Sequence, residues 1–184
     1  MSEYQYYEFL KLNKPLTPNE RKIMDSLSSR AKITTHGASY VYNYGDFRSN
    51  PKELLLKYFD IFFYIANWGS ISLMFKYHEK QVCIDELKKY CVKDVISCRK
   101  HGNNILLNIE LNNEGGFGWI EGEGILPDLL PLYDEFKAGD YQLLNLIAEA
   151  CHTNNQDKSN YSDRALTDAQ EAFLKYAEFG DLVD

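Results

Sequence analysis

The chain has 184 residues, a formal net charge of −7 at pH 7 and a hydrophobic content of 45%. This length is sufficient for one sizeable core but short for two full-sized domains. The hydrophobic content excludes an intrinsically disordered chain. The negative charge argues against nucleic acid and anionic membrane surfaces as partners. We therefore expect a soluble globular protein that does not bind membranes and for which another protein is a better partner than nucleic acid.

Cysteine usage and the longest apolar stretch bear on the compartment. The four cysteines are Cys83, Cys91, Cys98 and Cys151. They form no Cys-x-x-Cys pair, and the first residues lack the pattern of a secretory signal, so we expect a cytoplasmic location. Residues 54–68 are the longest apolar stretch, but they contain Lys57 and Asp60. Because the stretch is shorter than the roughly 20 residues that span a bilayer, it predicts a buried helix.

The first 44 residues predict a strand, a helix and a hairpin. Residues 4–12 are apolar on both alternating sets, which is typical of a strand buried on both faces. Residues 17–20, Thr-Pro-Asn-Glu, have the composition of a capping box and predict the start of a helix. Residues 32–44 alternate in polarity, and Gly37 divides them into two strands joined by a turn.

The next segments predict a helix and a strand. Asn50 repeats the helix start signal, and apolar residues follow at helical spacing until Gly69. Residues 71–77 alternate with a period of two and predict a strand with one buried face. The order strand, helix, hairpin, helix, strand matches a ferredoxin-like split βαβ core, in which two helices cover one face of a mostly antiparallel sheet. We therefore predict an α+β fold of this type.

The remaining residues predict a hairpin, several helices and a polar linker. The expected segments are a helix at 84–91, a hairpin at 95–111 that turns at Gly102-Asn103, a glycine-rich loop at 115–124, helices at 129–137 and 141–151, a polar stretch at 152–164 and a capped helix after Thr167. The expected domains are an α+β sheet domain at 1–125, a helical hairpin packed on it at 126–151, a linker at 152–165 and a C-terminal amphipathic helix at 166–184. We expect the hairpin at 95–111 to extend the sheet.

Several short phrases resemble an uncharacterised family of bacterial proteins to which no activity is assigned. They are Tyr-Gln-Tyr-Tyr-Glu-Phe at 4–9, Tyr-Gly-Asp-Phe at 44–47, the segment 58–69 that begins Tyr-Phe-Asp and ends Ala-Asn-Trp-Gly, Leu-Leu-Pro-Leu at 129–132, Gly139-Asp140 and the closing residues 166–184. The resemblance implies a bacterial origin and a shared fold. It transfers no catalytic residue, substrate or cofactor to this chain, so function has to be argued from the residues themselves.

The most distinctive candidate for a binding site is aromatic. Its residues are Tyr40, Tyr42, Tyr44, Phe47 and Trp68. An aromatic sheet face can stack nucleic-acid bases, but the acidic charge opposes that use and the sequence phrases of RNA-recognition domains are missing. A tyrosine-rich protein-binding surface, or simple core packing, explains the same residues more economically.

Four carboxylates are candidate catalytic groups, namely Asp46, Asp60, Glu121 and Glu123. Asp60 lies within the predicted apolar helix, where an unpaired buried carboxylate would be costly. It is either a buried functional acid, or a residue that lies on the exposed stripe of the helix or pairs with a basic neighbour. Glu121 and Glu123, with Glu114 or Asp128, could hold a magnesium ion through carboxylate oxygens. The favoured interpretation is structural: Asp60 is exposed or paired, and the acidic run is solvated surface.

The cysteine and glycine motifs give even weaker evidence for a metal, catalytic or nucleotide-binding site. Cys91, Cys98 and His101 have zinc-binding side chains, but the ligand set is incomplete, and cysteine nucleophiles lack a local signature. Buried thiols are the favoured interpretation. Residues 115–118, Gly-Gly-Phe-Gly, lack the order of a dinucleotide-binding loop and favour a flexible turn. We expect neither a metal nor a cofactor.

Three functions from different classes follow. The preferred one is a non-catalytic interaction or regulatory module that binds another protein through aromatic surface and through the C-terminal helix. The second is an enzyme of unrecognised type that uses Asp46, Asp60, Glu121 and Glu123. The third is a binder of single-stranded nucleic acid through the aromatic sheet face.

Overall fold

The computed structural model describes residues 3–152 and 164–177 and has the predicted α+β class. The chain forms two compact units that are interleaved in sequence. Unit 1 comprises Met1–Lys76 and Glu110–Leu126, and unit 2 comprises Tyr77–Ile109 and Pro127–Asp184. None of the helices in the described part of the chain has the length and apolarity required to cross a bilayer.

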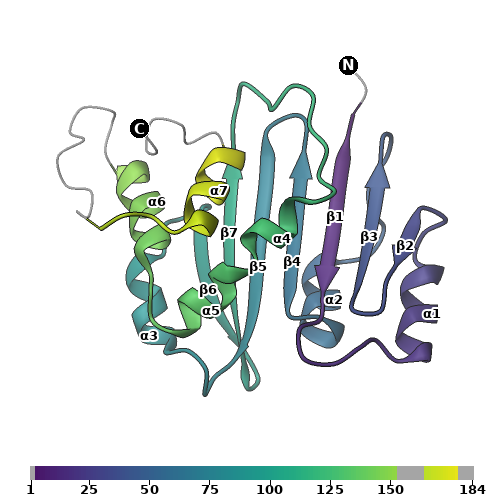
Figure 1. Ribbon diagram of the computed structural model, residues 1–184, viewed down its shortest axis with the longest axis horizontal. Helices are drawn as coiled ribbons and strands as arrows, with labels where there is room; N and C mark the ends of the chain where they lie inside the picture. The colour runs from purple at the N-terminus through teal and green to yellow at the C-terminus, as the bar shows by residue number, and fades with distance from the viewer. Residues whose placement is uncertain (1–2, 153–163, 178–184) are drawn as a thin grey trace. The chain divides into compact units, whose positions relative to one another are not determined.

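Unit 1 contains an antiparallel sheet with two helices. Its elements are β1 (Gln5–Leu10), α1 (Pro18–Ser26), β2 (Ala31–Ile33), β3 (Gly37–Tyr42), α2 (Pro51–Tyr58), β4 (Ile61–Ala66) and the greater part of β5 (Ser70–His78) (Figure 1). The strands follow the order β2-β3-β1-β4-β5, and each neighbouring pair is antiparallel. In this register Tyr7 of β1 lies between Tyr40 of β3 and Tyr64 of β4.

The edge strand β2 is shorter than its neighbour. Its three residues pair with Ala38, Ser39 and Tyr40 of β3. The last two residues of β3 therefore lie beyond the end of β2.

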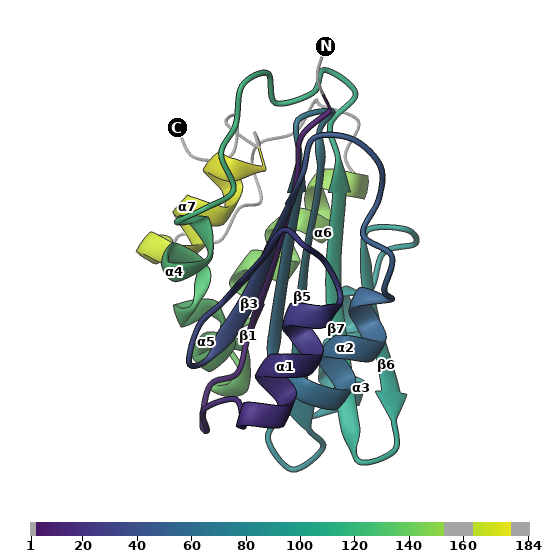
Figure 2. The same ribbon diagram turned by 90° about the vertical axis from the view of Figure 1, so that its right-hand side faces the viewer.

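Both helices of unit 1 begin at the predicted residues. Thr17 and Glu20 form a reciprocal capping box, which satisfies backbone donors that a helix N-terminus otherwise leaves unpaired. Asn50 caps α2 by accepting hydrogen bonds from two backbone amides. Figure 2 shows α1 and α2 on the same side of strands β1 and β3. The Tyr40 hydroxyl donates a 2.9 Å hydrogen bond to the carbonyl of Met24 in α1.

An aromatic core fills the space between the sheet and these helices. The ring of Phe9 lies 5.2 Å from that of Phe59 and 4.8 Å from that of Phe62, and the rings of Tyr40 and Phe47 are 4.7 Å apart. All of these side chains are buried. Such tilted aromatic pairs add to the free energy gained from burying their area.

The prediction of one long helix from Asn50 to Gly69, and of a buried helix at 54–68, is wrong. The helix α2 ends at Tyr58, Phe59 has extended backbone angles, and residues 61–66 form the strand β4. The sequence of β4, Ile-Phe-Phe-Tyr-Ile-Ala, is almost entirely buried on both faces, so its apolar residues fit a helical spacing as well as an extended one. Its aromatic and β-branched composition favours the strand.

Unit 2 holds a strand pair and the later helices. The elements are α3 (Ile84–Leu87) with a 3-10 turn at Lys88–Tyr90, β6 (Ile96–His101), most of β7 (Asn104–Asn112), the end of α4 (Ile125–Leu129), α5 (Pro131–Lys137), α6 (Gln142–His152) and α7 (Asp168–Tyr176). Strands β6 and β7 pair antiparallel from Ile96 opposite Ile109 to His101 opposite Asn104.

The helix α7 begins after Thr167, as its capping box predicts. Glu135 of α5 accepts hydrogen bonds from the Thr167 hydroxyl at 2.7 Å and from Gln170 Nε2 at 2.8 Å, which ties the start of α7 to α5. Most of the predicted linker and residues 178–184 lie outside the described residues.

Candidate protein-interaction surface

Four segments of unit 1 meet at one end of its strands. They are the start of β1, the end of β3, the β4–β5 turn and the loop at 113–124. The Tyr4 amide donates a 3.0 Å hydrogen bond to Asn67 Oδ1, and the Asn67 amide donates one of 3.1 Å to the Tyr4 carbonyl. The Gly122 amide donates to the Tyr4 hydroxyl at 2.9 Å. The N-terminal residues therefore connect the turn to the loop.

Backbone hydrogen bonds hold the loop at 113–124 against the β4–β5 turn. The amides of Asn113 and Phe117 donate to the carbonyls of Gly69 and Asn67 at 2.8 and 3.0 Å. Gly69 has a φ of +102°, and a Cβ atom there would lie 1.9 Å from the Asn113 carbonyl oxygen. A Cβ atom on Gly122 would lie 2.4 Å from the Tyr6 ring. The close approach of the loop therefore requires glycine at both positions.

Large aromatic side chains are exposed at this end. Tyr44 is 71% exposed, Trp68 43% and Trp119 89%. We call the surface formed by Tyr44, Trp68 and Trp119 the aromatic end. Exposed tyrosine and tryptophan are enriched at protein interfaces, where they supply large contact areas.

The side chain of Trp68 is held by a short polar relay. Its indole N–H donates a 3.1 Å hydrogen bond to Ser70 Oγ, which in turn donates to Asn112 Oδ1 at 2.7 Å. A ring that is fixed in this way loses less conformational entropy when a partner covers it.

A buried amide supports the segment that presents Tyr44. Gln5 is 2% exposed, and its Oε1 accepts hydrogen bonds from the hydroxyls of Tyr7 at 2.6 Å and Tyr64 at 3.2 Å. Its Nε2 donates to the Gly45 carbonyl at 3.0 Å. Burial raises the pKa of Tyr7 to about 12 and raises the pKa of Tyr64, so both phenols remain protonated donors at neutral pH.

The structure divides the aromatic residues singled out from the sequence. Tyr40, Tyr42 and Phe47 are buried in the core beneath the helices, whereas Tyr44 and Trp68 are exposed. Tyr42 donates a 2.9 Å hydrogen bond to Ser28 Oγ, and the guanidinium of Arg30 lies 4.9 Å from its ring centroid. Trp119 was missed by sequence reasoning. The available signal was a large apolar side chain inside a glycine-rich loop, where no core position is expected.

The four candidate carboxylates do not form one cluster. Asp46 lies beside Gln5 Nε2 at 3.5 Å, and Asp60 lies at the opposite end of β1, where its Oδ2 accepts a 2.9 Å hydrogen bond from the Leu12 amide. Glu121 is exposed, and Glu123 forms an ion pair with Lys32. The structure therefore assigns pairing roles to Asp60 and Glu123.

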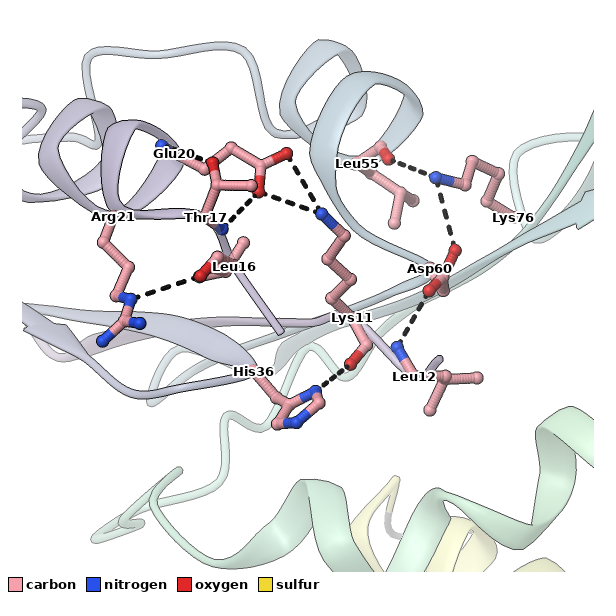
Figure 3. Close-up of polar contacts among 10 residues, drawn as sticks. All are labelled: Lys11, Leu12, Leu16, Thr17, Glu20, Arg21, His36, Leu55, Asp60 and Lys76. Carbon is pink, nitrogen blue, oxygen red and sulfur yellow. Dashed lines mark hydrogen bonds and ion pairs between the residues drawn. The ribbon is translucent and has the colours of Figure 1, made fainter. Parts of the chain in front are cut away.

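Figure 3 shows the polar contacts around Asp60. Lys76 Nζ lies 3.4 Å from Asp60 Oδ1 and donates a 3.3 Å hydrogen bond to the Leu55 carbonyl, so it links α2 to the segment that precedes β4. Lys11 pairs with Glu20 of α1 at 3.0 Å in the same region. These groups join the ends of helices and strands through internal partners. We call this the pinned end of unit 1.

Glu8 is a carboxyl group that sequence reasoning did not select. Its Oε2 accepts a 3.0 Å hydrogen bond from the Tyr6 hydroxyl. Burial raises the pKa of Glu8; the Tyr6 hydrogen bond lowers it, nearby Glu123 raises it further and Lys32 lowers it. Because Glu8 lies in the middle of a strand, the alternating pattern alone gave no reason to assign it a special environment.

The metal and cysteine candidates are scattered. Within residues 3–152 and 164–177, no three His, Cys, Asp or Glu side chains are grouped in a way that could hold a metal ion. Cys98 is buried, and burial raises the pKa of its thiol to about 12, so it is protonated at neutral pH. Cys83, Cys91 and Cys151 are exposed free thiols, so the interpretation of the cysteines as buried is wrong for these three. Gly116 and Gly118 both have positive φ angles, as expected for a turn.

Comparison with known proteins adds no assignment: no family model matches the chain, and neither a curated protein nor a solved structure shows significant similarity to it.

Proposed function

We propose that this chain is a non-catalytic interaction or regulatory module of a bacterial cytoplasmic system, and that it binds another protein through the aromatic end of unit 1. The observation on which the proposal rests is Trp119. Its side chain is 89% exposed, although the loop that presents it is hydrogen-bonded through Phe117 and Gly122 on either side. A large apolar group on a fixed loop is the usual anatomy of an interface anchor.

The surrounding structure supports binding without rearrangement. Tyr44 lies next to a glycine whose carbonyl is held by Gln5, and the Trp68 indole is held by Ser70. Association therefore requires little ordering of the backbone, and most of the free energy gained from covering the rings remains available for affinity. This property fits a protein surface better than a catalytic pocket.

The fold that presents this surface is, in our proposal, a ferredoxin-like split βαβ core. The strand order β2-β3-β1-β4, the antiparallel pairing and the placement of α1 and α2 on one side support it. In this arrangement β4 occupies the position that we predicted for residues 71–77, and β5 is an added strand.

The alternative functions have less support. Glu8, with its raised pKa, favours a carboxylate-dependent enzyme, but its hydrogen-bond partner is the hydroxyl of Tyr6. For nucleic acid, Tyr40 and Tyr42 are covered by side chains of the core, so they offer no base-stacking face. The net charge of −7 also repels phosphate groups.

The test is capture of a partner in a cell extract from the source organism. The purified full chain is used as bait, and the recovered proteins are quantified against W68A and W119A variants. We expect a protein partner in stoichiometric amount with the unchanged chain and at least a tenfold loss with either variant, since interface anchors contribute more than about 1.4 kcal/mol. Y58A serves as the control, because Tyr58 is a partly exposed aromatic residue at the end of α2, close to Asp60 at the pinned end. Recovery of the free chain alone would contradict the proposal.

A further inference from the structure

The charges of the aromatic end indicate what kind of partner it accepts. The loop at 113–124 contains Glu114, Glu121 and Glu123 and no lysine or arginine. Glu123 is paired with Lys32, whereas Glu114 and Glu121 are exposed and take part in none of the ion pairs found among the described residues. Two unneutralised carboxylates therefore flank Trp119 in the chain.

The aromatic rings at this surface also favour a positively charged partner. The face of a tryptophan ring attracts a cation, and it does so more strongly than tyrosine or phenylalanine. The chain already uses this contact once nearby, where the guanidinium of Arg30 lies over the Tyr42 ring. Within the described residues no lysine or arginine lies over Trp68 or Trp119 in this way.

The spacing of the two tryptophans limits the length of the partner segment. The Phe117 amide is bonded to the carbonyl of Asn67, which precedes Trp68, and Trp119 follows Phe117 by two residues. The chain lengths involved place the Cα atoms of Trp68 and Trp119 within roughly 16 Å of each other, a distance that about five extended residues can span.

We infer that the aromatic end binds a basic, extended segment of a partner protein, in which at least two arginine or lysine side chains lie over Trp68 and Trp119 and pair with Glu114 and Glu121. The inference rests on the proposed function and specifies its partner. Arginine fits best, because its planar and weakly hydrated guanidinium group stacks on aromatic rings while it donates to carboxylates. The acidic charge of the chain favours the encounter with such a segment.

The experiment uses two synthetic peptides of twelve residues, one alternating glycine and arginine and the other alternating glycine and glutamate. Each is titrated into the full chain while tryptophan fluorescence and heat of binding are recorded. We expect saturable binding of the arginine peptide, no binding of the glutamate peptide, and weaker binding as salt is raised, because exposed charge pairs are screened.

Variants separate the contributions. E114Q together with E121Q should weaken the arginine peptide about three- to tenfold, which corresponds to two exposed ion pairs, and W119A should weaken it at least as much. The matched control, D25N with E171Q, removes two exposed carboxylates elsewhere and should change affinity by less than about twofold. Equal affinity for both peptides, or no effect of the Glu114 and Glu121 changes, would overturn the inference.

The same variants distinguish this inference from the proposed function. If the captured protein partner is lost with W119A but binds equally well to the E114Q/E121Q variant at low and high salt, the interaction surface stands and the basic segment is wrong. If a twelve-residue thymidine oligonucleotide binds at the aromatic end while the arginine peptide does not, both proposals fail. A partner whose binding is reduced by both sets of changes supports both.

Discussion

The two ends of the unit 1 strands treat their side chains in opposite ways. At the pinned end Asp60 pairs with Lys76 and with the Leu12 amide, Lys11 pairs with Glu20, and little of these side chains is exposed to solvent. At the aromatic end Tyr44, Trp68 and Trp119 meet water, although hydrogen bonds fix the backbone around them. Order and burial are therefore separate properties. The contacts of the pinned end order its residues and stabilise the fold, whereas at the aromatic end the backbone is ordered but the three rings remain uncovered.

The largest expected effect comes from Gly69, which tests whether the fixed loop is required for binding. In G69A the new Cβ would lie 1.9 Å from the Asn113 carbonyl, at a φ of +102° that disfavours side chains. We expect a loss of about 3 kcal/mol of unfolding free energy from backbone strain and displacement of the loop. Urea denaturation measures the loss of unfolding free energy, and the affinity for the arginine peptide reports the displacement of the loop. G102A, at a positive φ with open space around its Cβ position, is the control for the backbone term alone.

Substitutions of Asp60 test the contribution of the pinned end to stability. D60A removes the acceptor of the Leu12 amide and the partner of Lys76, and we expect it to cost about 2 kcal/mol of unfolding free energy, since both groups lose a partner in a half-buried region. D60N retains an acceptor for the amide and should cost less. Neither change should alter the affinity for the arginine peptide in the folded chain. A loss of peptide affinity in folded D60A would show that the two ends are not independent.

Glu8 gives the smallest effect and a pH dependence. Its pKa is raised in the folded chain, mainly by burial, so folding favours its protonated form. The stability associated with Glu8 is therefore complete below its unfolded pKa and is lost as the pH rises through its folded pKa. We expect E8Q and the unchanged chain to have the same melting temperature near pH 4. At pH 7 E8Q should melt at a higher temperature, and the difference should be smaller than the effects of G69A and D60A. Thermal melts of both proteins across this range provide the measurement. An equal difference at both pH values would assign the effect to packing.

Local signals in the sequence predicted much of this fold. The capping residues at Thr17, Asn50 and Thr167 gave the starts of three helices, because a cap is satisfied within four residues and does not depend on the rest of the chain. The strand β4 was missed, since a strand buried on both faces has no alternation to distinguish it from a buried helix.

The site was harder to predict than the fold. Tyr40 and Tyr42 have the same pattern as an exposed aromatic face, and only the positions of α1 and Phe47 show that they are covered. Tyr44 comes after the end of β3, so the alternating pattern did not apply to it. Trp119 lies in a loop, where its exposure depends on backbone hydrogen bonds to residues about 50 positions away in sequence.

The short strand β2 has a consequence for how copies of the chain behave toward one another. It leaves Val41 and Tyr42 at a sheet edge, where backbone groups can recruit a strand from another molecule. Arg30 stands beside this gap, with its guanidinium over Tyr42 and a 3.5 Å hydrogen bond to the Tyr44 carbonyl. A charge at an open edge disfavours the addition of further strands. The chain can thus expose aromatic side chains at this end while Arg30 protects the neighbouring sheet edge against aggregation by strand addition.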